Sequence, residues 1–269
     1  MYSKSKPHFI AYICTLSLTL VFTILLTLSF VFSFDSDIGY LSAKNALPTV
    51  MRIFAFASFG GIAVFGFSFC KSEKCDVSEN HSSYKVICIS VGAVAVLCAG
   101  ALTVIGGVNI KNILISVGIL CLGGYISCTG FDCSAYSTPK FVLLSASVLA
   151  YAVTAYKNYT DFSRPINSSE NVIYSCISII MLLFILTELK VMLGRRSDFH
   201  FASMLAGFFA NFSCSVSYFI AYACGKVANK EFLSLMILSL ALSIYLQSKL
   251  VRTIPQRSPS ESQRSGSEE

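Results

Sequence analysis

Long apolar stretches recur along the chain and are separated by short polar links. A helix needs about 20 mostly apolar residues to cross the hydrocarbon core of a bilayer. On this criterion the pattern predicts eight spans, at residues 9–34, 53–70, 86–106, 113–131, 141–156, 172–189, 199–224 and 232–246. The predicted fold is therefore an all-α, polytopic transmembrane helical bundle over residues 1–250, followed by a disordered tail at 251–269 that is rich in Ser, Arg and Glu.

The seventh predicted span, residues 199–224, has two unlike sides on a helical wheel. One side is small or polar and carries Ser203, Gly207, Asn211, Cys214, Tyr218 and Tyr222. The other side is mainly aromatic and carries Phe201, Leu205, Phe208, Phe209, Phe212, Val216 and Phe219. Because lipid tails are as apolar as Leu, we expect the polar side to face other helices or a cavity, and the Phe-rich side to face lipid. Asn211 lies near the middle of this span, and either a packing contact with a partner helix or a ligand contact would explain it.

Hydroxyl groups form a stripe along the first span, where Thr15, Thr19, Thr23 and Thr27 recur every four residues. The favoured interpretation is that they bond back to carbonyls one turn earlier, and the alternative is that Thr19 and Thr23 line a path for a solute.

Glycines interrupt the second span at Gly60, Gly61 and Gly66, and the third span is rich in small residues. Close packing against neighbouring helices is the favoured interpretation for both spans. A broken helix beside a binding site is the alternative for the second.

Glu188 is the acidic residue that the prediction places inside a span, with Arg195 and Arg196 in the link that follows. An ionisable group at membrane depth is a functional candidate, for instance in proton coupling. The simpler interpretation is that Glu188 reaches the lipid headgroups or pairs with Arg195. We expect His200, at the start of the next span, to be an interfacial residue.

Composition supports a membrane protein and leaves no room for a soluble domain of typical size. The 269 residues are 55% hydrophobic and 13% charged, and the mean hydropathy is +0.70. The net charge of +6 is scattered over loop ends, so a nucleic-acid partner is not indicated. Of the 20 Lys and Arg residues, 13 fall on the side that holds both termini and 7 on the other, which predicts cytoplasmic termini. We expect an integral protein of the plasma membrane.

The order of long and short links is similar in residues 1–135 and 136–250. A parallel repeat of four spans would explain the similarity, as would chance among short connections.

Motifs for catalysis and cofactor binding are missing from the sequence. It contains no P-loop, no HExxH and no GxSxG, and its three histidines are far apart. The cysteines and histidine around residues 70–88, with Cys128 and Cys133 nearby, are too loosely spaced to predict a metal site. We therefore predict no catalytic, cofactor-binding or metal-binding residues. Asn158 and Asn167 match the short glycosylation pattern, for which chance is the better explanation.

The leading hypothesis for function is a non-enzymatic interaction or regulatory component of a membrane assembly, with the lipid bilayer and other membrane proteins as partners. It depends on the small-residue faces and on the scarcity of ionisable groups within the spans. The alternative is a small-solute transporter with a site lined by the polar faces of the first and seventh spans. All six prolines lie in loops, tails or first turns, which argues against the broken helices of many transporters.

Overall fold

A computed structural model describes residues 6–35, 40–42, 45–69, 82–131, 137–160, 169–194 and 199–253. Eight helices and one short hairpin occupy these ranges. The helices are α1 (Lys6–Ser33), α2 (Leu47–Phe69), α3 (Ser82–Ile105), α4 (Ile110–Gly130), α5 (Ser137–Thr160), α6 (Ser169–Met192), α7 (His200–Ala223) and α8 (Lys230–Thr253). The strands β1 (Phe34–Asp35) and β2 (Tyr40–Leu41) pair antiparallel between α1 and α2.

All eight helices are long and apolar enough to cross a membrane, and each coincides with one predicted span. The predicted all-α bundle is therefore confirmed at this level. One boundary changes the chemistry: the prediction ended the eighth span at residue 246, whereas α8 continues to Thr253. Lys249 and Arg252, which lie beyond the predicted end of the eighth span, are therefore on a helix.

Local sequence signals set several helix ends. The side chain of Asn109 caps α4 by accepting a hydrogen bond from the Asn112 backbone N–H at 2.8 Å. After α7 the chain turns at Gly225, whose φ of +68° is in the left-handed region that favours glycine. The N–H of Lys226 then bonds the carbonyl of Ala221 at 2.9 Å. The Asn109 cap belongs to the α3–α4 connection and the Gly225 turn to the α7–α8 connection, the two tight connections that the sequence predicted.

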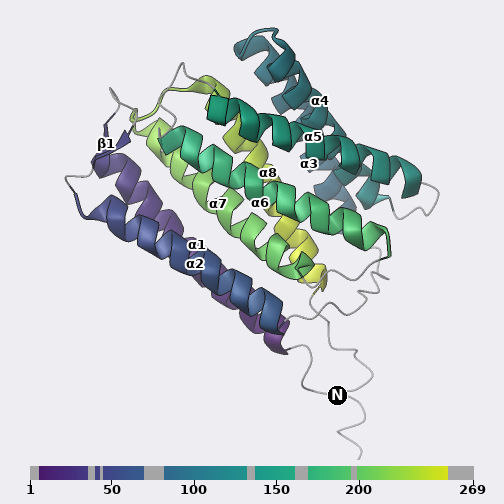
Figure 1. Cartoon of the computed structure of the whole chain (residues 1–269), viewed down its shortest axis with the longest axis horizontal. Helices are drawn as coiled ribbons and strands as arrows, with labels where there is room; N and C mark the ends of the chain where they lie inside the picture. Colours follow the sequence, from purple (N-terminus) through teal and green to yellow (C-terminus); the bar gives the residue numbers. More distant parts are fainter. Residues whose placement is uncertain are drawn as a thin grey trace, which may run out of the picture.

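Six helices form a closed ring, in which α3 packs on α4, α4 on α5, α5 on α6, α6 on α7, α7 on α8, and α8 back on α3. The remaining pair, α1 and α2, lies outside the ring and packs against α7. In Figure 1 this pair runs along one side of the molecule, with α6 and α7 beside it and α3, α4 and α5 on the far side.

Successive helices run in opposite directions, so the bundle has two ends. We call the end where α6 and α8 finish the Glu188 end, and the end where they begin the Glu170 end. The start of α1 and the finish of α8 both lie at the Glu188 end, as an even number of antiparallel helices requires.

The orientation expected for the Phe-rich side of the seventh span is wrong. Of the most apolar 18 residues of α7, 72% are buried, against 22% for α2. Phe209 is fully buried, and its ring centre lies 5.0 Å from that of Phe22 on α1 and 5.0 Å from that of Phe59 on α2. Hydropathy does not distinguish lipid from a neighbouring helix here, because both are apolar and either can cover an apolar face.

Small residues do bring helices close together, as predicted for the third span. A Cβ built on Gly92 of α3 would lie 1.9 Å from the Ser127 hydroxyl of α4, and one on Gly118 of α4 would lie 1.8 Å from the Cβ of Ala150 on α5. On α2, Gly66 approaches Ala202 of α7 in the same way, whereas Gly60 and Gly61 have open space beside them. The helix continues through all three glycines, so it is not broken there.

The two halves of the predicted repeat pack differently. Within residues 136–250, α6 contacts both α5 and α7, while in the first half α2 contacts α1 and then α7 of the other half. The repeat stays a prediction from the order of the links.

Candidate functional site: a buried charge cluster

Glu188 lies at the centre of a polar cluster inside the ring, about one turn from the end of α6. One carboxylate oxygen, Oε1, accepts a hydrogen bond of 2.5 Å from the Tyr125 hydroxyl on α4 and pairs with the ammonium group of Lys249 on α8. The other oxygen, Oε2, lies 3.1 Å from Nε2 of His200 on α7. One side chain thus joins four helices, and we call Glu188, Tyr125, Lys249 and His200 the charge cluster.

Aromatic rings surround the cation of the charge cluster. The Lys249 nitrogen lies 5.6 Å from the centre of the Phe184 ring and 5.9 Å from that of Tyr245. Both distances suit cation–π attraction, which is stronger where water is excluded. The side chains of Glu188, His200 and Lys249 are only 9%, 14% and 19% exposed. Such burial makes the ion pair costly to break, because a single remaining charge would be left without a partner.

His200 is fixed by a second set of hydroxyl groups. Its Nδ1 lies 3.4 Å from the Thr187 hydroxyl, which is 2.8 Å from the hydroxyl of Ser203. The imidazole also stacks on the Phe184 ring at 6.1 Å between ring centres. His200 is the first residue of α7, so the expectation of an interfacial residue stays a prediction, but its ring faces the buried carboxylate, which the sequence did not indicate.

The sequence singled out Glu188 correctly as an ionisable group within a span, but not its partners. Arg195 and Arg196 lie outside the described residues, and the partners that the structure shows come from α4, α7 and α8. Lys249 had a sequence signal, because Leu250 and Val251 continue the apolar pattern of α8 beyond it. Tyr125 had none, since nothing in an isolated apolar helix shows which residue a distant helix will meet.

A second polar cluster lies at the Glu170 end. Tyr218 of α7 donates to Glu170 of α6 at 3.0 Å, and the side chain of Asn229 donates to the same carboxylate at 2.9 Å. Asn229 also caps α8, because its Oδ1 accepts from the N–H of Phe232 at 3.3 Å. These bonds tie the start of α6 to the α7–α8 turn.

The hydroxyl stripe of α1 mostly bonds back to its own helix, as favoured. Thr19 donates to the carbonyl of Thr15 and Thr23 to that of Thr19, both at 2.7 Å. The stripe faces α7, where Ser213 and Ser217 donate to carbonyls of α1 at 3.3 and 3.1 Å. The Thr stripe of α1 therefore bonds to α7 through Ser213 and Ser217, which are not among the residues of the polar side of α7.

Asn211 is fully buried on α7. Its side-chain nitrogen donates to the carbonyl of Gly207 at 2.7 Å and lies 3.2 Å from the sulfur of Met181 on α6. This is contact with a neighbouring helix, while the buried side-chain oxygen Oδ1 has no hydrogen-bond partner in the described part of the chain, so the packing interpretation stays a prediction. The structure places Asn211 on α7 well away from Glu188 along the helix, since eleven residues separate it from His200 and span about 16 Å.

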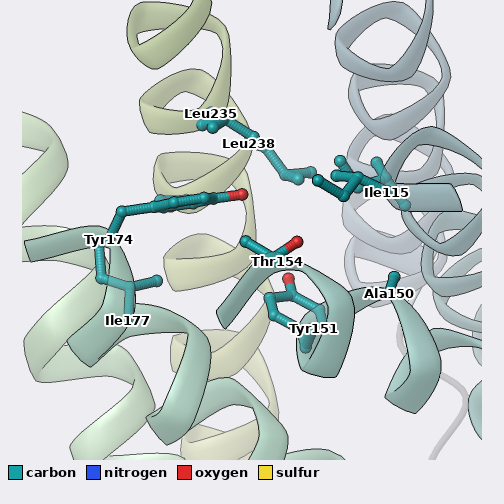
Figure 2. A pocket seen from close by; sticks show the side chains of 10 residues that line it. Ile115, Ala150, Tyr151, Thr154, Tyr174, Ile177, Leu235 and Leu238 are labelled. Atoms are coloured by element: carbon teal, nitrogen blue, oxygen red, sulfur yellow. The ribbon is translucent and has the colours of Figure 1, made fainter. Parts of the chain in front are cut away.

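A small cavity lies between α4, α5, α6 and α8, on the Glu170 side of the charge cluster. Figure 2 shows the hydroxyl groups of Tyr151, Thr154 and Tyr174 turned toward one another at its wall. Ser239 also lines it, and the other lining residues are apolar. The cavity measures about 10 Å³, which is room for about one water molecule.

Among the described residues, no group of three or more His, Cys, Asp or Glu side chains could hold a metal ion. Cys70, Cys75, His81 and Cys133 lie outside those residues, as do Asn167 and the side chain of Asn158. The prediction of no metal site and the interpretation of the two Asn motifs therefore stay predictions.

In the part of the chain that the structure describes, eight apolar helices have the length and composition of an integral multi-pass membrane protein. Comparison with protein families, with curated proteins and with solved structures finds no match to this chain.

Proposed function

We propose that the protein is an integral multi-pass membrane protein with a non-enzymatic role, as an interaction or regulatory component of a membrane assembly. The observation that carries the proposal is that described side chains bond to one another at both ends of the ring, with a small cavity between them. The charge cluster occupies one end, the Glu170 cluster occupies the other, and the cavity between α4, α5, α6 and α8 has room for about one water molecule. We therefore expect other molecules to bind to the outer surface of the bundle.

The pair formed by α1 and α2 supports an interaction role. It lies outside the ring, and α2 contacts the rest of the bundle through α1 and α7. The outward face of α2 is apolar, with Phe56 80% exposed and Val64 62% exposed. In a bilayer this face meets lipid or another membrane protein, both of which suit apolar side chains.

The proposal includes an orientation and a location. The Glu188 end faces the cytoplasm, because it carries more of the Lys and Arg residues of the links and tails. The plasma membrane is the proposed site, with no nucleic acid and no cofactor among the partners.

The test is purification of the tagged full chain from its native membranes in mild detergent, with mass spectrometry of everything that accompanies it. A second tagged multi-pass protein expressed at the same level serves as the control for adventitious partners. We expect a membrane protein to accompany the chain in a fixed ratio and to be missing from the control. A protein that purifies alone and carries a bound small solute would overturn the proposal.

That last outcome would favour the alternative, a small-solute transporter. The hydroxyl-lined cavity inside the ring supports it, because a few convergent polar groups in an apolar surrounding are typical of ligand sites. The site would then lie between α4, α5, α6 and α8, and not between the first and seventh spans.

A further inference from the structure

The charge cluster crosses the interior of the ring. Around the ring α4, α6 and α8 alternate with α5, α7 and α3, so Tyr125, Glu188 and Lys249 come from helices that each pack on other neighbours. Their bonds therefore run through the middle of the ring and not along a single helix–helix contact. Tyr125 and Lys249 are each within about two turns of the helix ends at the Glu188 end.

The hydroxyl-lined cavity lies deeper along the same helices. Ser239, on its wall, precedes Lys249 by ten residues of α8, or about 15 Å. Ile177, also on its wall, precedes Glu188 by eleven residues of α6, or about 16 Å. Along the helices, the charge cluster thus stands between this cavity and the Glu188 end of the ring.

The bonds that hold the charge cluster together depend on the charges of Glu188 and Lys249. With both partners present, the carboxylate and the ammonium group satisfy each other in surroundings that exclude most water. If Glu188 loses its charge, Lys249 remains as a buried cation without its anion, which is strongly unfavourable. The ammonium group regains hydration by moving toward the water at the Glu188 end.

We propose that Glu188, Lys249 and Tyr125 form an ion-pair gate that closes the ring interior at the Glu188 end and opens when Glu188 is neutralised. This gate goes beyond the proposed interaction role and stands on the geometry of the charge cluster alone. In the open state water reaches the side chains directly behind the ion pair.

A native cysteine reports on the gate. Cys88 of α3 is 0% exposed, and its sulfur lies 3.8 Å from the hydroxyl of Thr129 on α4. One turn away on α3, Tyr84 stacks on Tyr245, whose ring adjoins Lys249. Cys98, also buried on α3, lies ten residues deeper, or about 15 Å, and serves as an internal control.

The experiment measures the rate at which N-ethylmaleimide modifies each cysteine of the full-length protein in lipid nanodiscs at fixed pH, by mass spectrometry of the peptides. Glu188→Gln should raise the rate at Cys88 by about tenfold or more, because it leaves the buried Lys249 without its anion. The rate at Cys98 should stay near that of the wild type. Glu170→Gln, which changes a carboxylate of the same helix at the other end, should leave the Cys88 rate unchanged.

A second variant separates a gate from general loosening. Adding Lys249→Met to Glu188→Gln removes both charges, and the Cys88 rate should return toward the wild-type value. A wild-type rate at Cys88 in Glu188→Gln would overturn the proposal. So would an equal rise at Cys98 with a lower melting temperature, since that would show loss of the whole fold. If Glu188→Gln does not fold, Lys249→Met decides in the same way, because it leaves the buried carboxylate without its cation, and a rise is expected at Cys88 alone.

Discussion

Buried hydroxyl groups on α1 illustrate how little a polar residue in a span says about function by itself. Thr15 and Thr19 are each 2% exposed, and both donate to a carbonyl four residues earlier. That carbonyl already takes part in the helix, so the hydroxyl satisfies itself without a partner from outside. A stripe of this kind lets two helices approach while each polar group stays bonded.

Replacing both Thr19 and Thr23 by Val should therefore change little. We expect the free energy of unfolding to fall by about 1 kcal/mol or less per site, because each change removes one local hydrogen bond and adds an apolar methyl group. Denaturant unfolding in detergent, followed by far-UV circular dichroism, measures this. A double variant that folds normally but loses its accompanying membrane protein would show that these hydroxyls contact something beyond α1 and α7.

At the same scale, sequence reasoning recognised the charge of Glu188 and its depth but not its surroundings. A carboxylate in an apolar run is conspicuous, whereas Tyr125 and His200 look ordinary in their own segments. The sequence separations from Glu188 to its partners are 63 residues for Tyr125 and 61 for Lys249. Only the closure of the ring brings these residues together, so no local pattern could reveal them.

At the scale of helices, packing between α3, α4 and α5 depends on the absence of side chains at a few positions. Gly92 and Gly118 each occupy a point where any Cβ would overlap an atom of the neighbouring helix. Close approach of backbones is the main source of helix association in a bilayer, because lipid competes for apolar contacts. Glycine is unfavourable inside a helix in water, so its use here indicates a packing requirement.

Gly118→Ala should destabilise the bundle, since the new Cβ would lie 1.8 Å from that of Ala150. We expect a loss of about 1–3 kcal/mol or more, the usual cost of overpacking, seen as a lower melting temperature by circular dichroism. Gly100→Ala on α3 is the matched control, because a Cβ there meets nothing within 4 Å. Equal effects of the two changes would show that the α4–α5 contact is looser than described.

The orientation of α7 shows the limit of an amphipathic pattern. Its polar side faces other helices as predicted, since Asn211 and Tyr218 are buried and both contact residues of α6. Its aromatic side is also covered, by Phe22 of α1 and Phe59 of α2. A helical wheel separates two faces but contains no information on whether lipid or a neighbouring helix covers the apolar one.

At the scale of the whole molecule, the sequence predicted the eight helices of the described residues and the two tight hairpins, α3–α4 and α7–α8. Helix length and short links decide both features. It did not predict the contact of α8 with α3 that closes the ring, nor that of α1 with α7. Both join segments far apart in sequence, and their apolar surfaces could fit several arrangements. The order in which the helices pack side by side therefore cannot be predicted from the apolar pattern of each helix alone.

The last prediction concerns how this bundle lies in its membrane. Eight spans put both ends of the chain on one side, and the excess of Lys and Arg there predicts that this side is cytoplasmic. A reporter that is active only in the cytoplasm should be active when fused after Ser260 in the tail or after Gly194, which lies at the Glu188 end. It should be inactive when fused after Asn167 in the link before α6 or after Gly225, which lies at the Glu170 end. Activity at Asn167 with none at Ser260 would invert the orientation and place the ion-pair gate on the outer face. Equal activity of the fusions at Ser260 and Asn167 would contradict the arrangement of eight spans.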